Sequence, residues 1–376
     1  MMRDLIVFGE DWGGLPSSTQ HLVRHLARDR RVLWVNSIGM RRPRLTARDL
    51  GRLGHKVRAM LTGAGHAGPA AVPPPFPVVA PRALPWPGNP LARAFNRRVL
   101  GGQIARAAAA HGLRDPVLWT SLPTAVEVVG RLGEHAVVYF CGDDFGALAG
   151  VDHAPVLRME RELVDSADLI FVVSQPLADR FPSAKTHILQ QGVDFDLFST
   201  PVAPAPDLPR GGPVAGFFGM IEDWVDTDLL AEVARCRPAW QFFLIGTVKT
   251  DVSALAALSN VTLAGPRPYQ SLPSYCQHWS VSLLPFRDGD TMRAANPLKL
   301  REYLAAGQPV VSTDFPWLDD YRDLVAVATG PAGYAAALES ALREPAGRCK
   351  PRRERVAAES WPTRAAQAAA LIDALG

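Results

Sequence analysis

The sequence predicts an α/β protein of two domains, each built on a parallel sheet with helices on both faces. The chain has 376 residues, enough for two domains that each bury a core. Short apolar runs of strand length alternate with helical segments along most of it, the pattern of a doubly wound parallel sheet. A stretch dense in proline, residues 201–213, interrupts the alternation and is the expected interdomain linker.

The expected strands are apolar runs bounded by turn-forming residues, and the expected helices are longer segments with apolar residues on one face. In the first domain, residues 1–200, we expect strands at 4–9, 31–35, 117–120, 136–140 and 169–174, and helices at 20–27, 91–110 and 154–166. In the second domain, residues 214–360, we expect strands at 214–219, 240–246, 261–264, 281–285, 310–313 and 325–327, and helices at 227–235, 253–258, 272–279, 297–306 and 331–348. A last helix is expected within residues 361–376.

Composition narrows the class of protein. Apolar residues make up 48% and charged residues 20%, which is ordinary for a globular chain, and the net charge of +3 does not indicate a nucleic-acid binder. The four cysteines form no C-x-x-C pair, which argues against a zinc site or a disulfide scaffold and fits a reducing cytoplasm. No run approaches the roughly 20 apolar residues that span a bilayer, and no signal peptide is visible. We therefore expect a cytoplasmic protein whose contact with a membrane, if any, is peripheral.

The stretch Asn296–Thr313 predicts a helix that runs into a buried strand. Asn296 suits the position before the helix, and Pro297 suits its first turn, where a missing N–H costs nothing. Gly307 ends the helix because it adopts positive φ at little cost. Lys299 and Glu302 then lie three residues apart on one face.

A cation at a helix N-terminus opposes the helix dipole unless an anionic ligand also lies there. A phosphate beside Lys299 and a sugar diol beside Glu302 would explain both residues. The alternative is a surface Lys and Glu on an ordinary amphipathic helix.

The sequence motif of this stretch, P-x-K-x-x-E-Y-L-A-x-G-x-P-V-V, resembles the nucleotide-sugar signature of GT-B glycosyltransferases, in particular the family 4 group. The resemblance implies a GT-B fold: two Rossmann-like domains facing a cleft, with the C-terminal helix crossing back to the N-terminal domain. It implies that Lys299 meets the donor diphosphate and Glu302 the ribose hydroxyls. Members often carry a second Glu eight residues before the ribose Glu, and Ala294 stands there in this chain.

The resemblance extends to other donor-binding positions. Gly13 and Gly14, in the loop after the first strand, match glycines that approach the donor phosphate, and Gly219 matches a glycine beside the same phosphates. Members commonly follow that last glycine with an Arg and a Lys, but here the segment 220–226 is acidic. The remaining donor candidates are the two arginines and the two helix-start residues Arg287, Arg293, Asn296 and Leu298.

Carboxylates after the first-domain strands are the catalytic candidates. Asp143 and Asp144 follow the strand at 136–140, at the sheet edge where ligands bind in open α/β sheets, and one could act as general base or orient an acceptor hydroxyl. The alternative is that these two aspartates only cap a helix and lie in a solvated loop. The surrounding residues resemble the Y-x-x-x-D-D-F-x-x-F stretch of the same glycosyltransferases, and Asp11, with Glu10, would face the acceptor.

Residues 41–61 alternate arginines and a lysine with leucines. They predict either a contact with an anionic membrane surface or a solvated basic face, and the sequence favours neither.

The implied reaction is transfer of a sugar from a nucleotide diphosphate sugar to the hydroxyl of a lipid-linked or polysaccharide acceptor, without a cofactor or metal and with retained anomeric configuration. Three alternatives remain at this stage: a nucleotide-sugar 2-epimerase of the same fold, a non-catalytic nucleotide-sugar-binding subunit, and a structural membrane-associated protein.

Overall fold

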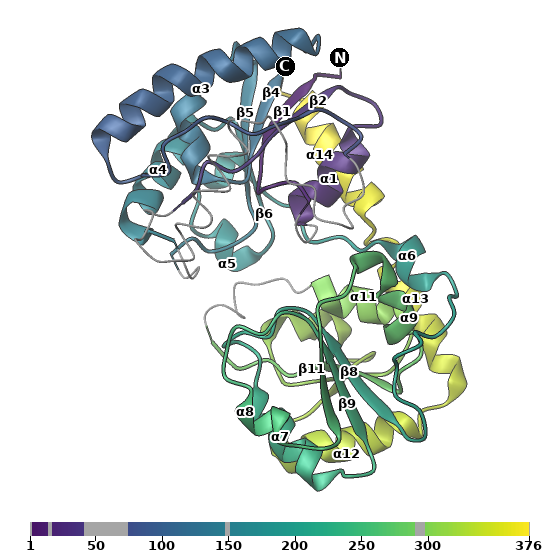
Figure 1. The fold of residues 1–376 in the computed structure, drawn as a ribbon. Helices are drawn as coiled ribbons and strands as arrows, with labels where there is room; N and C mark the ends of the chain where they lie inside the picture. Colours follow the sequence, from purple (N-terminus) through teal and green to yellow (C-terminus); the bar gives the residue numbers. More distant parts are fainter. Residues whose placement is uncertain (1, 14–16, 41–73, 147–150, 290–297, 376) are drawn as a thin grey trace. The chain divides into compact units, whose positions relative to one another are not determined.

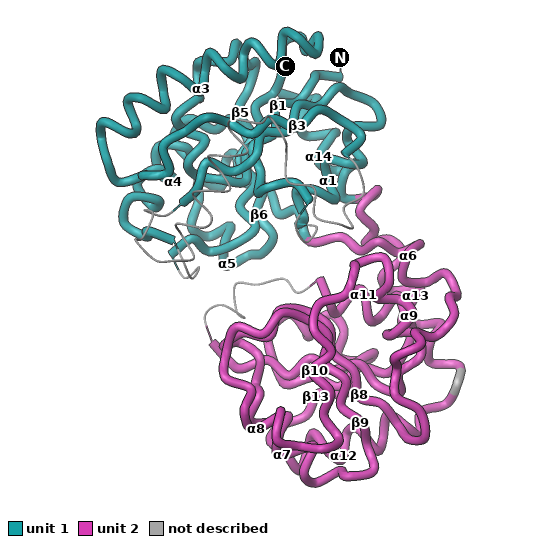
Figure 2. Tube along the Cα trace, in the orientation of Figure 1, with its two compact units in different colours: residues 1–190, 364–376 teal, residues 191–363 magenta. Residues whose placement is uncertain are grey.

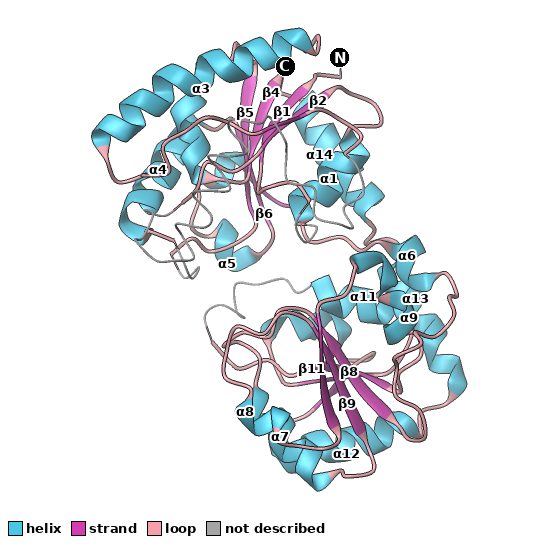
Figure 3. Ribbon diagram, in the orientation of Figure 1, coloured by secondary structure: helices cyan, strands magenta, loops and turns pink. Residues whose placement is uncertain are grey.

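The structure, a computed structural model, describes residues 2–13, 17–40, 74–146, 151–289 and 298–375 (Figure 1). The chain forms two compact units, coloured separately in Figure 2: unit 1 is residues 1–190 with 364–376, and unit 2 is residues 191–363. In each unit, helices enclose a central set of strands (Figure 3). The predicted α/β class with two parallel sheets is confirmed.

Unit 1 is built on a seven-stranded parallel sheet in the order β3-β2-β1-β4-β5-β6-β7. Its strands are β1 (Leu5–Phe8), β2 (Val32–Val35), β3 (Val78–Val79), β4 (Val117–Thr120), β5 (Ala136–Cys141), β6 (Leu169–Val172) and β7 (Thr186–Ile188). Its helices are α1 (Ser18–Leu26), α3 (Pro90–Ala110), α4 (His153–Ser166), α5 (Gln175–Ala178) and most of α14 (Trp361–Asp373), with short 3-10 helices η1 (Pro123–Val128) and η2 (Ser183–Lys185).

The central strands of unit 1 have the composition of a fully covered parallel sheet. β1, β2 and β4 are buried along their whole length, because helices lie on both faces and leave no side for polar residues. Phe8 at the end of β1 lies opposite Val35 and Thr120, so the three strands end together at the carboxyl edge of the sheet. The last helix crosses back as predicted: the guanidinium of Arg30 is paired with Asp373 of α14 at 3.1 Å.

Unit 2 repeats this arrangement with six parallel strands in the order β10-β9-β8-β11-β12-β13. The strands are β8 (Val214–Phe218), β9 (Gln241–Ile245), β10 (Val261–Gly265), β11 (Val281–Leu284), β12 (Val310–Ser312) and β13 (Ala326–Val327). The helices are α6 (Phe195–Ser199), α7 (Thr227–Cys236), α8 (Ser253–Ala256), α9 (Pro273–Cys276), α11 (Leu298–Ala306), α12 (Gly330–Leu342) and α13 (Cys349–Ala357), with 3-10 helices η3 (Tyr269–Ser271), η4 (Pro316–Tyr321) and η5 (Ala346–Arg348).

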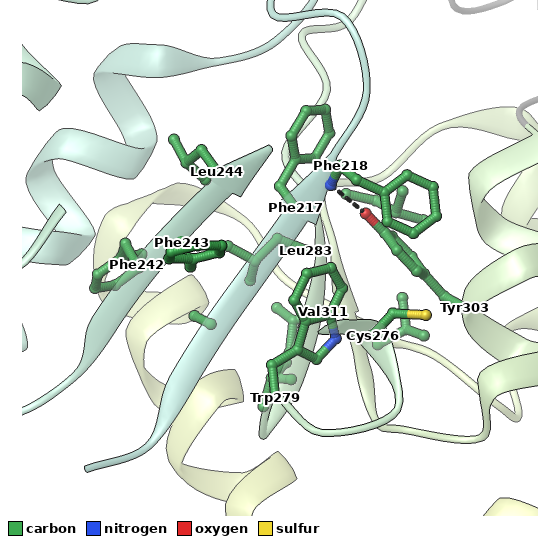
Figure 4. Packing of buried hydrophobic residues seen from close by; sticks show 14 of the residues in the cluster. Phe217, Phe218, Phe242, Phe243, Leu244, Cys276, Trp279, Leu283, Tyr303 and Val311 are labelled. Carbon is green, nitrogen blue, oxygen red and sulfur yellow. Dashed lines mark hydrogen bonds between the residues drawn. The ribbon is translucent and has the colours of Figure 1, made fainter. Parts of the chain in front are cut away.

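A glycine in β8 lets an aromatic cluster pack against the sheet (Figure 4). A Cβ atom at Gly216 would lie 1.8 Å from Cε3 of Trp279, so only glycine leaves room for the indole. Tyr303 of α11 packs edge-on against Trp279 and Phe218, and its hydroxyl accepts a hydrogen bond from the Phe218 N–H at 3.0 Å. This cluster fixes α11 against the end of β8.

The structure differs from the prediction at short elements and at boundaries. The edge strands β3 and β7 were not predicted, because two or three partly exposed residues carry no pattern. The helix expected at 331–348 ends at Leu342, ahead of Pro345, and α13 follows it. Unit 1 ends at residue 190 and not 200, because the fully buried Phe198 of α6 belongs to the core of unit 2.

Candidate active site

Helix α11 is held by contacts with several other elements of unit 2. Besides the Tyr303 contact with β8, Arg353 of α13 donates to the last helical carbonyls, Ala305 O at 3.1 Å and Ala306 O at 2.9 Å. A cation at this end also interacts favourably with the negative end of the helix dipole. The buried Arg301 pairs with Glu359 at 2.6 Å. The helix that carries Lys299 and Glu302 is therefore held rigidly, which a binding constellation requires.

Lys299 lies directly over Gly219, the residue that follows β8. A Cβ atom at Gly219 would lie 1.9 Å from Cε and 2.7 Å from Nζ of Lys299, and Gly219 has a φ of +139°. The Gly219 N–H donates to Ile245 O at 2.8 Å and so is not available to a ligand. Gly219 therefore serves the site by leaving space for the lysine side chain.

The Lys299 ammonium has no carboxylate within ion-pairing distance among the described residues. Its Nζ lies 5.8 Å from the centre of the Phe217 ring, and the side chain is half-buried. Burial lowers the pKa of Lys299, while the nearby Glu302 carboxyl raises it. A half-buried cation without a carboxylate partner is ready to bind an anionic group, such as a diphosphate.

Glu302 is almost fully buried and is held by one hydrogen bond, which the Tyr269 hydroxyl donates to Oε1 at 2.9 Å. Burial raises the pKa of the Glu302 carboxyl to about 7, although the Tyr269 hydrogen bond and the Lys299 charge lower it. Asp194, at the start of α6, raises it further. The carboxyl thus changes its charge near neutral pH, and its ionised form accepts hydrogen bonds such as those of a ribose diol.

A second glycine at the same sheet edge is required by close packing. A Cβ atom at Gly246, after β9, would lie 1.7 Å from the carbonyl oxygen of Gly219. The Gly246 N–H in turn donates to Gly265 O, at the end of β10. The ends of β8, β9 and β10 are therefore linked backbone to backbone beneath Lys299.

The other predicted donor residues have different placements. Arg287 is paired with Asp228 at 2.7 Å and with Asp226 at 3.4 Å, so neighbouring carboxylates already neutralise its charge. Leu298 is the first residue of α11 and is half-buried. Gly13 has a φ of +97°, as a tight turn after β1 requires. Three further candidates lie outside the described residues: Gly14, Arg293 and Asn296.

The carboxyl edge of unit 1 carries the predicted catalytic candidates. Asp143 and Asp11 are exposed. Asp144 is half-buried and paired with Arg180 at 2.5 Å, and it accepts the N–H of Gly146 at 2.8 Å. Asp143 and Asp144 are therefore unequal: Asp144 is fixed within the loop, whereas Asp143 faces solvent.

Glu10 adds a carboxyl to this edge, two residues after the end of β1. Its carboxylate accepts a hydrogen bond from the hydroxyl of Ser17, the residue that caps α1. Burial raises the pKa of Glu10, against the hydrogen bonds of Ser17 and Gln20. The Ser17 hydroxyl and the buried Gln20 side chain thus both lie against the Glu10 carboxyl.

The described part of the chain offers neither a metal-binding cluster nor a membrane-spanning helix. Its His, Cys, Asp and Glu residues form no group of three that could hold a metal ion. None of its helices is both long and apolar enough to cross a membrane.

The fold is that of the GT-B glycosyltransferases. Anabaena HepE, solved in complex with UDP and glucose, superposes with a TM-score of 0.67 at 14% identity over 100% of both chains. Sucrose-phosphate synthase from Thermosynechococcus elongatus superposes with a TM-score of 0.69 at 18% identity over 99% of each chain.

Residues 212–344, within unit 2, match the family described as glycosyl transferases group 1. The glycosyltransferase TuaH of Bacillus subtilis (strain 168), named for teichuronic acid biosynthesis, is 32% identical over 221 residues, which are 53% of this chain and 55% of TuaH. The chain thus spans about half the length of this curated relative. The resemblance to GT-B, group 1 glycosyltransferases that the α11 signature indicated is confirmed.

Sequence reasoning missed Tyr269 as a partner of Glu302 and Gly246 as the support of Gly219. Neither residue has a distinctive local pattern, because each acts through a contact with a distant strand or helix. The available signal for Tyr269 was its place at the end of the segment 265–269, which contains two prolines after a predicted strand.

Proposed function

We propose that this protein transfers a sugar from a nucleotide diphosphate sugar to an acceptor hydroxyl, in the synthesis of a cell-surface polysaccharide or glycolipid. The observation that carries the proposal is the arrangement of Lys299 and Glu302 on one rigid helix, with Gly219 leaving space for the lysine. The complex of HepE with UDP and glucose and the assignment of TuaH to teichuronic acid biosynthesis support it.

In the proposed reaction, the acceptor oxygen forms a bond to the anomeric carbon as the bond from that carbon to the diphosphate breaks. The diphosphate leaves with the electron pair, and the Lys299 ammonium and the N-terminus of α11 stabilise the charge that develops on it. Arg287 takes no part in this role, because Asp226 and Asp228 already bind it. Gly14, Arg293 and Asn296 stay in the proposal as further donor contacts.

On the acceptor side, we propose that Asp143 receives and orients the hydroxyl, with Asp144 fixing the loop through Arg180. Glu10 and Asp11 lie at the same edge as secondary candidates. We further propose that the anomeric configuration is retained and that no metal is needed. In a retaining transfer, the oxygen of the departing diphosphate takes the proton of the acceptor.

The acceptor in this proposal is a lipid-linked or growing polysaccharide chain. The name of TuaH supports a polysaccharide product. The basic segment 41–61, which lies outside the described residues, supports a contact with the cytoplasmic face of a membrane.

Calorimetric titration with UDP, GDP, ADP and dTDP tests the donor site. We expect one nucleotide to bind wild type selectively and to lose its binding in Lys299→Ala. Binding that survives in the variant, or no binding of any nucleotide to wild type, would contradict the proposal. Once the donor is known, the anomeric configuration of the product and turnover in excess chelator test retention and metal independence.

A further inference from the structure

Exposed apolar side chains are concentrated at the start of α3. Among the described residues, nine large apolar side chains are exposed, and four of them lie between residues 84 and 95. Leu91 is 81% exposed, Phe95 47%, Leu84 46% and Trp86 39%. We refer to these four residues as the α3 surface. Exposed apolar residues scattered singly need no explanation, but a cluster of this kind marks an interaction site.

The α3 surface stands on a well-ordered framework. Asn89 caps α3 by accepting the N–H groups of Leu91 at 2.9 Å and Ala92 at 3.1 Å. The buried Asn96 both accepts the Leu84 N–H at 2.8 Å and donates to the Leu84 carbonyl at 2.9 Å. The segment that carries Leu84 and Trp86 is therefore attached to α3 by hydrogen bonds. The two side chains are exposed although their backbone is held in place.

Arginines border this apolar cluster. Leu91, Phe95 and Arg98 are spaced by four and three residues, so they share one face of α3. A hollow of about 500 Å³ lies beside that face. It is lined by one proline, one alanine and four arginines: Pro90, Ala94, Arg93, Arg97, Arg98 and Arg131.

The charges of these arginines are only partly balanced. Glu127 and Glu162 pair with Arg93 and Arg97. No carboxylate of the described residues lies within ion-pairing distance of Arg98 or Arg131, and both are exposed. The border of the α3 surface therefore carries uncompensated positive charge.

We propose that the α3 surface docks on a membrane that contains anionic lipids. Leu91 protrudes instead of lining a groove, which suits insertion into a soft apolar phase better than packing against a second folded surface. The exposed cations Arg98 and Arg131 lie where headgroup phosphates would meet them. The proposal is independent of the sugar-transfer activity, and it names a contact separate from the basic segment 41–61.

Sedimentation with vesicles of phosphatidylcholine, with and without phosphatidylglycerol, tests the proposal on the full chain. Wild type binds the anionic vesicles, and added salt weakens binding. Leu91→Ser with Phe95→Ser lowers that binding at least about tenfold, because two inserted side chains are lost. Arg98→Ala with Arg131→Ala lowers it on anionic vesicles only, about fivefold for each cation.

Matched controls lie elsewhere on the chain. Leu342 of α12 is 48% exposed and Arg210 is exposed, so Leu342→Ser removes one leucine and Arg210→Ala one arginine from another place, and both leave vesicle binding at the wild-type level. Thermal unfolding confirms that every variant is folded. Binding that persists in the Leu91→Ser, Phe95→Ser variant would overturn the proposal and move the contact to residues 41–61. Equal loss in the Leu342→Ser control, or no binding of wild type, would overturn it as well.

Discussion

The sheets of the two units share the order of their first six strands but carry different side chains at the carboxyl edge. In both, the first strand of the unit lies inside the sheet, with later strands added on either side: β2 and β4 flank β1, and β9 and β11 flank β8. After β8, the edge holds Gly219 with the Lys299 ammonium over it. After β1, it holds the carboxyl of Glu10. In the proposed function, the first of these edges binds the anionic donor and the second binds groups that donate hydrogen bonds.

The fold determines where a ligand binds but not which ligand binds there. Parallel strands place loops and helix starts at one edge in either unit. In unit 2, glycines at the strand ends let a cation lie close to the backbone, and no carboxylate of the described residues pairs with that cation, although the segment after β8 is acidic. In unit 1, carboxylates gather and Arg180 balances part of their charge. This division suits a charged donor on one side and a neutral, hydroxyl-bearing acceptor on the other.

The largest expected effect comes from removing the cation of unit 2. Lys299→Ala should lower turnover at least about 100-fold, because the charge on the leaving diphosphate loses its main stabiliser. The free energy of unfolding should not fall, since Lys299 has no ion-pair partner among the described residues. Donor-dependent product formation and chemical denaturation measure the two quantities.

Lys350→Ala is the matched control, because Lys350 is an exposed lysine of α13 whose one ion pair among the described residues is with Glu354. Its turnover should equal that of wild type. A Lys299→Ala enzyme that works within twofold of wild type would remove the chemical distinction between the two edges.

Gly219→Ala tests the position of the Lys299 ammonium without removing its charge. The added Cβ would meet Lys299 Cε at 1.9 Å and force the side chain away, so donor affinity should fall about tenfold or more, which is about 1.4 kcal/mol or more. The φ of +139° adds backbone strain of roughly 1–3 kcal/mol. Calorimetry and thermal unfolding separate the two effects.

Gly211→Ala controls for the strain alone, because Gly211 has a φ of +92° and no atom within 4 Å of the added Cβ. If Gly219→Ala and Gly211→Ala reduce donor affinity equally, Gly219 has no special role beneath the lysine.

The sequence predicted the sheets and the residues of one helix, but not the contacts between elements. The central strands are continuous apolar runs, and Lys299 and Glu302 are three residues apart in a specific pattern, so both could be recognised locally. Arg287 could not be judged that way, because Asp228 is 59 residues away in sequence. The sequence likewise does not distinguish the roles of Asp143 and Asp144, because the ion pair of Asp144 with Arg180 joins residues that are distant in the chain.

Glu302→Gln should change how donor affinity depends on pH. In wild type, the Glu302 carboxyl has a raised pKa of about 7. The fraction of ionised carboxylate, which accepts hydrogen bonds from the ribose hydroxyls, therefore increases as pH rises from 6 to 8, and donor affinity should rise with it. The variant should bind the donor about tenfold more weakly at pH 8, with no rise across this range, because a hydrogen bond to a charged group is lost. Calorimetry at several pH values measures this, and a parallel rise in the variant would assign the pH effect to another group.

The same carboxyl should make the free energy of unfolding depend on pH. Because the folded state holds its proton up to about pH 7 and the unfolded state releases it near pH 4.5, stability should fall between these values and level off above them. The fall should be absent in Glu302→Gln. Denaturation of both proteins at pH 5 and pH 8 compares the two slopes, and equal slopes would show that Glu302 titrates normally.

The edge of unit 1 should respond differently to similar changes. Asp143→Asn should lower turnover about tenfold through poorer orientation of the acceptor, while donor affinity stays at the wild-type value. Asp144→Asn removes the ion pair with Arg180 and should act more weakly, by loosening the loop. Steady-state kinetics and nucleotide calorimetry give both readouts. A loss of nucleotide binding in Asp143→Asn would place this residue with the donor and end the division of labour between the edges.

The smallest expected effect is that of Tyr269→Phe, which removes one hydroxyl from the donor side. That hydroxyl donates to Oε1 of Glu302 and lowers the carboxyl's pKa, so without it the pKa should rise above about 7. Donor affinity should then fall about threefold at pH 7 and recover at pH 8, as expected for one hydrogen bond to a carboxylate that is still present. A loss that is equal at both pH values would mean that Tyr269 contacts the nucleotide directly. Tyr275→Phe is the control, since its hydroxyl accepts from Arg267 and donates to Asp207, away from Glu302, and its donor affinity should equal that of wild type at both pH values.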